Sequence, residues 1–320
     1  MSTPPPTSHS ARKPVPSSAS LDSLRIPKRK EHNLKIRPIA IGVCAMAKKA
    51  QSGPMSEILN RLRSYHSGGL RNFTVVFFPE EVILNSPVED WPTCDALIAF
   101  FSKGFPMAKA QAYARLRQPL VFNDLVKQEL LLNRLSVYRT LESVGVAVPR
   151  YVFYDAALAD STTVIDDDDY LQINDVKLRK PLLEKPISGE DHDIYIYYAR
   201  SQGGGSKRLF RKVGDQSAQY YPDVHTTRMH DGCSYIYEEM LQTEGTDVKV
   251  YAVGPEYAHA EARKSPVVDG RVMRNERGKE VRYPVILNTV EKEISRNVVQ
   301  AFGQTMCGFD ILRAEGQSYV

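Results

Sequence analysis

Short apolar runs alternate with helical patterns over the first third of the chain. Strands are predicted at residues 39–44, 73–78, 96–101 and 120–122, and helices at residues 54–65 and 106–116. Because strands that alternate with helices usually pair in one direction, we expect a parallel sheet in a small N-terminal α/β lobe over residues 36–124. The ends of these strands are expected to carry function.

The pattern changes after residue 124. A long helix is predicted over residues 125–144, because apolar residues from Leu131 to Leu141 share one face and Gly145 follows. Short apolar runs then predict an antiparallel sheet, at residues 151–154, 171–173, 182–186, 194–198 and 209–213. We therefore expect an α+β organisation in the second part of the chain, residues 125–320.

More strands, a helix and a hairpin are predicted near the end of the chain. The strands fall at residues 234–240, 248–253 and 257–262. Asn288, with Glu291 three residues later, predicts a capping box that opens a helix. A hairpin then begins at Gly308, turns at 315–317 and starts its return strand, so we expect the chain to end inside a strand.

Composition indicates an ordinary globular protein, with 42% hydrophobic and 25% charged residues. No apolar run approaches the roughly 18 to 20 residues that span a bilayer, so we expect no transmembrane segment and a cytosolic, possibly also nuclear, location. A net charge of +4 is too small to indicate a nucleic-acid partner. Cys44, Cys94, Cys233 and Cys307 form no C-x-x-C pair and are expected to be reduced, buried thiols.

The first 35 residues are rich in proline, serine and basic residues and are expected to form a disordered tail. Within them, Lys28–Lys30 is either a solvated basic run, which we favour, or a nuclear signal. A second charged run, Asp166–Asp169, is expected to be a solvated acidic turn rather than a metal site, because no ligand pattern accompanies it.

Basic residues gather on short strands or their loops at Lys48–Lys49, Arg211–Lys212, Lys249 and Arg263–Lys264. Any one pair alone is most simply a solvated surface pair. Lys249, however, lies between two valines, and Arg263–Lys264 closes an alternating run, so these charges fall on predicted sheet faces. Together the groups favour a pocket for a polyanionic ligand.

A second set of residues has the pattern of a nucleotide site. Lys185, at the end of an apolar strand, offers a fixed charge for phosphates, and His192 lies in the polar loop that follows. Glu238–Leu241, with Asp247 nearby, either contacts an adenine and ribose or is an edge strand with solvated carboxylates. The glycine loop at residues 201–206 suits phosphate binding or a flexible hairpin tip equally well.

Asp310 is a candidate metal ligand. A carboxylate between Phe309 and Ile311 on a buried strand is costly unless it is paired or binds a cation, and Mg²⁺ prefers such oxygen ligands.

The order Lys185, Glu238–Glu239, Asp247, Asp310 resembles the ATP-grasp superfamily. Finer motifs are similar to those of the diphosphoinositol pentakisphosphate kinases, over roughly residues 36–320: Glu184–Pro186 with Glu190–His192, Gly203–Gly205 with Leu209–Lys212, Tyr235–Glu239, Gly245–Tyr251 and Ala258–Pro266. The resemblance implies an ATP-grasp fold and ATP- and Mg²⁺-dependent transfer of phosphate to inositol hexakisphosphate or its 5-diphosphate derivative. Position 1 of the ring follows from the resemblance alone.

The resemblance also implies roles for individual residues. ATP contacts would be Arg134, Lys185, His192, Arg211, Glu238, Glu239, Met240, Leu241, Asp247, Val248, Lys249, Ser265 and Asp310. Inositol phosphate contacts would be Lys48, Lys49, Lys103, Arg211, Lys212, Lys249 and Arg263. Lys185, Arg211, Lys249 and Asp310 would act in catalysis, with Asp310 on the metal.

One departure from the family pattern leaves a second hypothesis open. The kinases carry an Asp-x-Asn on the returning strand, which these 320 residues do not contain, so their own activity is expected to be impaired. The alternative is therefore a binding module that retains the inositol phosphate cage without turnover. A third hypothesis, an ATP-grasp ligase, is disfavoured by the clustered basic residues.

Overall fold

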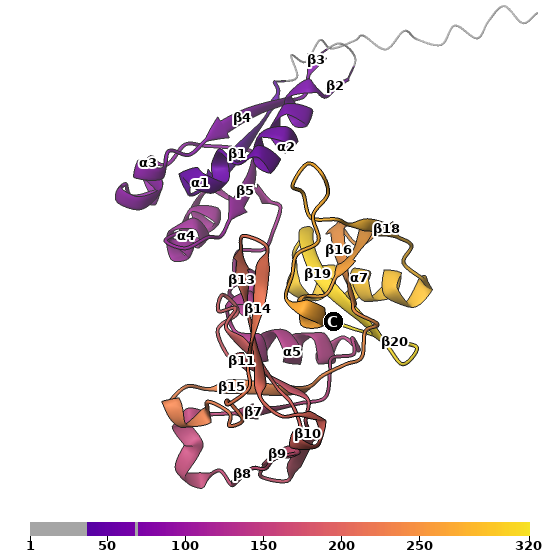
Figure 1. Ribbon diagram of the computed structural model, residues 1–320. Helices are drawn as coiled ribbons and strands as arrows, with labels where there is room; N and C mark the ends of the chain where they lie inside the picture. The colour runs from indigo at the N-terminus through magenta and orange to yellow at the C-terminus, as the bar shows by residue number, and fades with distance from the viewer. Residues whose placement is uncertain (1–36, 68–69) are drawn as a thin grey trace, which may run out of the picture. The chain divides into compact units, whose positions relative to one another are not determined.

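The first lobe is built on a parallel sheet of order β4-β1-β5-β6, as predicted. Its strands are β1 (Ile39–Ala45), β4 (Phe73–Phe77), β5 (Ala96–Phe100) and β6 (Leu120–Val121). Its helices are α1 (Ala47–Ala50), α2 (Gly53–Ser64), α3 (Glu80–Asn85) and α4 (Met107–Arg117), and a short ribbon joins β2 (His66–Ser67) to β3 (Leu70–Arg71). Figure 1 shows these elements in indigo and purple.

The computed structural model describes residues 37–67 and 70–320, of which Pro38–Val320 form one compact unit. The predictions for the first 35 residues, including Lys28–Lys30, lie outside the described residues. No helix in the described ranges is both long enough and apolar enough to cross a membrane. The boundary at residues 124–125 stays a prediction.

The long helix predicted over residues 125–144 is wrong, because Asn133 interrupts it. The chain forms a 3-10 turn, η2 (Lys127–Leu132), and then the helix α5 (Arg134–Ser143). Asn133 is extended, and its side chain caps α5 by accepting a bond from the amide of Ser136 at 3.0 Å. The break lets Leu132 accept a bond from Gly189, where a Cβ would lie 2.1 Å from the Leu131 carbonyl oxygen. Contact with a distant loop therefore overrides helical periodicity.

Two antiparallel sheets follow α5. The larger has the order β14-β13-β12-β11-β15-β7 and contains β7 (Tyr151–Tyr154), β11 (Leu182–Pro186), β12 (Ile194–Tyr197), β13 (Ser206–Val213), β14 (Gln216–Tyr221) and β15 (Tyr235–Glu239). The smaller has the order β10-β9-β8 and contains β8 (Val164–Asp166), β9 (Tyr170–Ile173) and β10 (Val176–Arg179). The run at residues 171–173 was expected in one sheet with its neighbours, and the structure places it in the separate smaller sheet.

The last part is a five-stranded antiparallel sheet of order β18-β17-β16-β19-β20. It contains β16 (Thr246–Val253), β17 (Tyr257–Lys264), β18 (Tyr283–Val285), β19 (Met306–Ala314) and β20 (Gln317–Tyr319), with helices α6 (Pro266–Asp269) and α7 (Thr289–Phe302). The predicted capping box of α7 and the hairpin β19–β20 are confirmed. The remaining 3-10 turns are η1 (Val88–Asp90), η3 (Ala156–Ser161), η4 (Arg200–Gln202) and η5 (Met229–Asp231).

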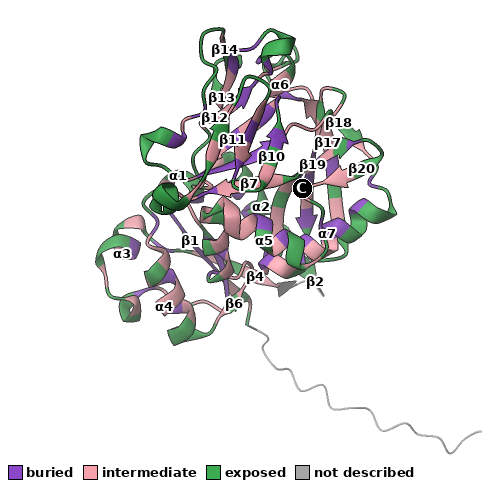
Figure 2. Ribbon diagram, turned by 90° about the horizontal axis from the view of Figure 1, so that it is seen from below, coloured by how far each residue is buried: buried purple, intermediate pink, exposed green. Residues whose placement is uncertain are grey.

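Two expectations about polar side chains are corrected. Asp166 is not part of a solvated turn, because its side chain is 9% exposed and pairs with Lys180 at 2.9 Å. Asp166 also accepts bonds from the amide and hydroxyl of Thr227, so the acidic run begins with a structural ion pair. All four cysteines are free thiols, but only Cys44 is buried as expected: Cys94 and Cys307 are partly buried and Cys233 is exposed. Figure 2 shows buried residues in purple along the sheets.

Candidate active site

A cavity of about 390 Å³ follows the segment that leaves β15. We call it the hinge pocket. Its lining comprises residues 238–245, Leu183 of β11, Tyr198 and Lys207 from the β12–β13 region, Asp247 of β16, residues 265 and 267–268, and Leu312 of β19. The predicted residues Glu238, Glu239, Met240, Leu241, Asp247 and Ser265 all line it. A pocket with apolar walls, backbone groups and carboxylates suits a nucleoside.

Two carboxylates of the hinge pocket have partners. Glu238 is 2% exposed, forms an ion pair with Lys185 and accepts a hydrogen bond from the Tyr138 hydroxyl. Burial, followed by Glu238, raises the pKa of Tyr138 well above its usual value, so this hydroxyl stays a donor. Glu239 pairs with Arg150 at 3.1 Å. Glu238 and Tyr138 thus hold Lys185 in place, although Lys185 is not among the residues that line either pocket.

Asp247 and Val248 face different environments on neighbouring positions of β16. Burial raises the pKa of Asp247, although hydrogen bonding by Ser265 and the charge of Arg263 oppose the rise. Val248 is 3% exposed and packs in the core with Val250 and Ile311. Val248 pairs with Ala262 and with Ile311 in the two neighbouring strands and lines neither pocket, so the structure does not bring this predicted ATP contact into the site.

A second cavity, of about 550 Å³, is lined by basic side chains from two sheets. We call it the basic pocket. Its basic lining is Arg211 and Lys212 of β13, Lys249 of β16, Arg263 and Lys264 of β17, and Arg271 of the segment after α6. Its carboxylates are Glu280 of the same segment and Asp310 of β19, and His192 also lines it. Six basic side chains thus face two carboxylates. The pockets adjoin where Asp247 of one approaches Arg263 of the other, at 4.0 Å.

The centre of the basic pocket holds polar atoms without hydrogen-bond partners. Asp310 Oδ1 lies 3.3 Å from Lys249 Nζ and 3.6 Å from Arg263 Nη2. Both Asp310 Oδ1 and Arg263 Nε are buried and make no hydrogen bond. Because buried polar groups are nearly always bonded, these atoms indicate that a polar ligand completes the pocket.

The loop between β11 and β12 is held by two predicted ATP contacts. Arg134 donates to the backbone carbonyls of Pro186, Ser188 and Asp191, and Arg211 donates to that of Glu190 at 2.9 Å. Burial, then the charges of Arg211 and Arg134, lower the pKa of His192. This shift favours the neutral form of His192. Arg134 lines neither pocket and instead shapes the loop.

Three predicted substrate contacts are not brought into the pockets. Lys48 and Lys49 are exposed on α1, which is green in Figure 2, and Lys49 Nζ lies 5.3 Å from the centre of the Phe100 ring. Lys103 is exposed in the segment between β5 and α4. None of the three is among the residues that line the hinge or the basic pocket.

The structure adds Arg271 and Glu280 to the basic pocket, and Glu280 forms an ion pair with Lys212. Arg271 and Glu280 lie in the segment after α6, which has no apolar periodicity, so only its many charges signalled them. Lys264 was visible as one half of a basic pair with Arg263.

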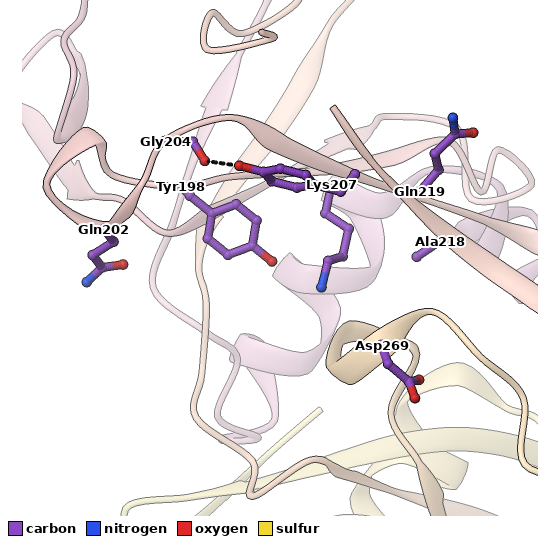
Figure 3. A pocket seen from close by; sticks show the side chains of 8 residues that line it. Tyr198, Gln202, Gly204, Lys207, Ala218, Gln219 and Asp269 are labelled. Atoms are coloured by element: carbon purple, nitrogen blue, oxygen red, sulfur yellow. Dashed lines mark hydrogen bonds between the residues drawn. The ribbon is translucent and has the colours of Figure 1, made fainter. Parts of the chain in front are cut away.

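The backbone of the glycine loop forms hydrogen bonds within its own hairpin and with a neighbouring histidine. Gly205 donates its amide to His225 Nδ1 at 2.9 Å, and Gly204 accepts a bond from the Tyr220 hydroxyl at 2.8 Å, drawn dashed in Figure 3. The open pocket in Figure 3 shares Tyr198 and Lys207 with the hinge pocket. Lys207 Nζ donates to the carbonyl of Val267 at 2.8 Å, so it joins β13 to α6.

Asp310 stands alone as a candidate metal ligand. In the ranges 37–67 and 70–320 there is no group of three or more histidine, cysteine or acidic residues that suits a metal ion. The unbonded Oδ1 of Asp310 fits one oxygen position on Mg²⁺. Further oxygens would come from a bound nucleotide, which is how Mg²⁺ usually enters kinase sites.

Comparison with solved structures defines the class of protein: the chain has the ATP-grasp fold. A RimK-domain ATP-grasp protein from Sphaerobacter thermophilus superposes with a TM-score of 0.52 at 10% identity, over 88% of both chains. The ATP-grasp ligase PsnB, complexed with a minimal precursor, gives a TM-score of 0.52 at 14% identity, over 89% of this chain and 88% of that one. At such identities the likeness concerns the fold alone.

Sequence comparison identifies the family. Residues 39–133 match the N-terminal domain of diphosphoinositol pentakisphosphate kinase 2. The human inositol hexakisphosphate and diphosphoinositol-pentakisphosphate kinase 2 is 54% identical over 89% of this chain and 22% of its own length. Counterparts from Arabidopsis thaliana and Saccharomyces cerevisiae are 53% and 44% identical, each over 88% of this chain and 26% of their own. The chain belongs to this kinase family and spans about a quarter of these relatives' length.

Proposed function

We propose that the chain is an inositol polyphosphate kinase. It transfers the γ-phosphate of ATP to a phosphate of inositol hexakisphosphate or of 5-diphosphoinositol pentakisphosphate. The carrying observation is the basic pocket, where six basic side chains face two carboxylates and two buried polar atoms make no hydrogen bond. This pocket adjoins the hinge pocket. The names of the relatives support the substrate class.

Each pocket takes one part of the reaction. Glu238–Leu241 and Asp247 hold the nucleoside, while Lys185, His192 and Arg211 are directed to its phosphates. Lys212, Lys249 and Arg263 hold the inositol phosphates. Lys48, Lys49 and Lys103 act before the substrate enters the pocket. Because the acceptor oxygen is already anionic, positioning and relief of repulsion suffice without a general base.

Magnesium belongs to this proposal through Asp310. Bound Mg²⁺ would neutralise charge between the β- and γ-phosphates of ATP. Asp310 also offsets Lys249 and Arg263, so it keeps two cations aligned at the meeting point of donor and acceptor. We also propose a cytosolic or nuclear location, which imaging of a fluorescent fusion tests.

The test is transfer of labelled γ-phosphate from ATP to inositol hexakisphosphate, with binding of each ligand measured by calorimetry in parallel. A kinase yields a labelled diphosphate product that needs Mg²⁺. A binding module, which the single metal-suited carboxylate favours, binds inositol hexakisphosphate without any labelled product. If the chain binds neither ATP nor inositol hexakisphosphate, both the kinase and the binding module are refuted.

A further inference from the structure

An arginine that lines neither pocket connects both ends of the loop between β11 and β12. Arg228 lies at the start of η5, and its side chain is 24% exposed. Its amide and its Nε donate to the carboxylate of Glu184, at 2.7 and 2.5 Å. Its Nη1 and Nη2 donate to the carboxylate and the carbonyl of Asp193, at 2.8 and 2.9 Å.

The surroundings fix this guanidinium in one orientation. Its central carbon lies 4.3 Å from the centre of the Tyr195 ring and 5.1 Å from that of Tyr235. Glu184 is fully buried and also accepts bonds from the hydroxyls of Tyr197 and Tyr237. A planar guanidinium holds two acceptors in fixed directions, whereas the ammonium of a lysine is a point charge without this fork.

The two residues that Arg228 joins stand next to proposed phosphate contacts. Lys185 follows Glu184 at the end of β11, and His192 precedes Asp193 at the start of β12. The middle of the loop is held through its carbonyls by Arg134 and Arg211, as described above. Arg228 therefore adds a side-chain link between the loop's two ends, next to the backbone pairing of Glu184 with Tyr195.

We propose that Arg228 is a positioning residue for nucleotide binding. It acts through Glu184 and Asp193 to hold Lys185 and His192 in the arrangement that the ATP phosphates require. The identity of the ligand, ATP, rests on the proposed function. The claim that Arg228 orders the loop at 187–193 rests only on the contacts of Arg228.

The test uses variants that keep the fold. Removing Arg228 alone leaves the charge of Glu184 buried without its partner, which is expected to unfold the chain. The double variant E184Q/R228M removes both charges, and its new amide side chain can still bond the two tyrosines, so it is expected to fold. R228K keeps a positive charge but lacks the fork. R208Q is the matched control, because Arg208 pairs with Asp193 but does not reach Glu184.

Hydrogen exchange of the loop amides in the ligand-free protein is the first readout. The amides of Gly189 and Asp193 donate to the Leu132 carbonyl and the Asp191 side chain in the intact protein. We expect E184Q/R228M and R228K to exchange them about tenfold faster, and R208Q to change them less than about threefold. Unchanged exchange in a folded E184Q/R228M overturns the proposal.

Calorimetry of a non-hydrolysable ATP analogue and of inositol hexakisphosphate is the second readout. In E184Q/R228M and R228K the analogue is expected to bind about tenfold more weakly, and the inositol phosphate within about threefold of the unaltered chain. Equal weakening of both ligands indicates a general structural role and contradicts the proposal. If the unaltered chain binds no nucleotide, the proposed function fails, and the exchange result still decides whether Arg228 orders the loop.

Discussion

The hinge pocket and the basic pocket adjoin, yet the charged side chains that line them are mainly acidic in the first and mainly basic in the second. The hinge pocket is lined by four carboxylates, Glu238, Glu239, Glu244 and Asp247, and by one lysine. The basic pocket is lined by six basic side chains and two carboxylates. In the first, Lys185 and Arg150 neutralise two carboxylates from outside. In the second, Glu280 and Asp310 leave most of the positive charge for a ligand.

This difference matches the two ends of the proposed reaction. An uncharged nucleoside needs apolar walls and hydrogen-bond acceptors for its amino and hydroxyl groups, whereas phosphates need cations. A nucleotide that lies across the junction near Asp247 and Arg263 would place its base in the first pocket and its phosphates toward the second. Charge, rather than size, therefore separates the two binding regions.

The largest expected effect comes from Asp310, the carboxylate at the centre of the basic pocket. We expect D310N to lower the rate of phosphate transfer at least about 100-fold while binding of an ATP analogue changes less than about threefold. Radiolabel transfer and calorimetry measure the two. D215N is the control, because Asp215 pairs with Arg274 at an exposed position and lines neither pocket. A D310N variant with more than half the normal rate contradicts the role.

A smaller effect is expected from the cations that contact Asp310. K249A and R263A should each weaken binding of inositol hexakisphosphate about 10- to 100-fold, and weaken the ATP analogue less, because both side chains face the basic pocket. R296A is the control, since Arg296 pairs with Glu256 and lines neither pocket. If calorimetry shows that both ligands lose affinity equally, the two pockets do not bind separate ligands, and the contrast between them is wrong.

The lysines outside the pockets test where the basic pocket ends. A K48A/K49A/K103A variant is expected to bind inositol hexakisphosphate within about threefold of normal at 0.15 M salt, with a larger loss at low salt. Exposed charges act over longer distances, and ions screen them. A loss as large as that of R263A at 0.15 M would show direct contact and would enlarge the basic pocket.

The smallest effect concerns one carboxylate from each pocket and its dependence on pH. Burial opposes ionisation of Glu280, but bonds from Lys212 and Arg282 outweigh it and lower its pKa below the ordinary value of 4.5. Its contribution to stability is therefore present above about pH 4.5 and is lost as the pH falls through the lowered pKa. E280Q should lower the free energy of unfolding by about 1 kcal/mol at pH 7.

The ionised carboxylate of Asp247 should have the opposite effect on the free energy of unfolding. Its pKa is raised above the ordinary value of 3.8, so its charge costs stability at neutral pH, and the cost disappears as the pH falls. D247N is therefore expected to be neutral or stabilising at pH 7. Urea unfolding of both variants between pH 7 and pH 3.5 measures the difference, and effects of the same sign at pH 7 would contradict the contrast between the pockets.

Local signals predicted much of this fold. The parallel sheet and the capped helix α7 followed from alternating apolar runs and from Asn288 with Glu291, which act within a few residues. The break at Asn133 did not, because a loop more than fifty residues away imposes it through Leu132 and Gly189. Periodicity carries no information about such distant contacts.

The candidate site divides in the same way. Lys249 and Arg263 were recognisable because charges interrupt alternating strands, and the structure brings both into the basic pocket. Arg228 was not, because it lies outside a regular strand and its partners, Glu184 and Asp193, come from other elements. Residues that position others depend on tertiary contacts, so one sequence does not reveal them.

The most direct test is a crystal structure of the chain with inositol hexakisphosphate and a non-hydrolysable ATP analogue. Our account predicts inositol phosphate oxygens within about 3 Å of Arg263 Nε and Lys249 Nζ, and the adenine against Glu239–Leu241. An inositol phosphate bound only at Lys48, Lys49 and Lys103, or an adenine seated among the cations of the basic pocket, would contradict it.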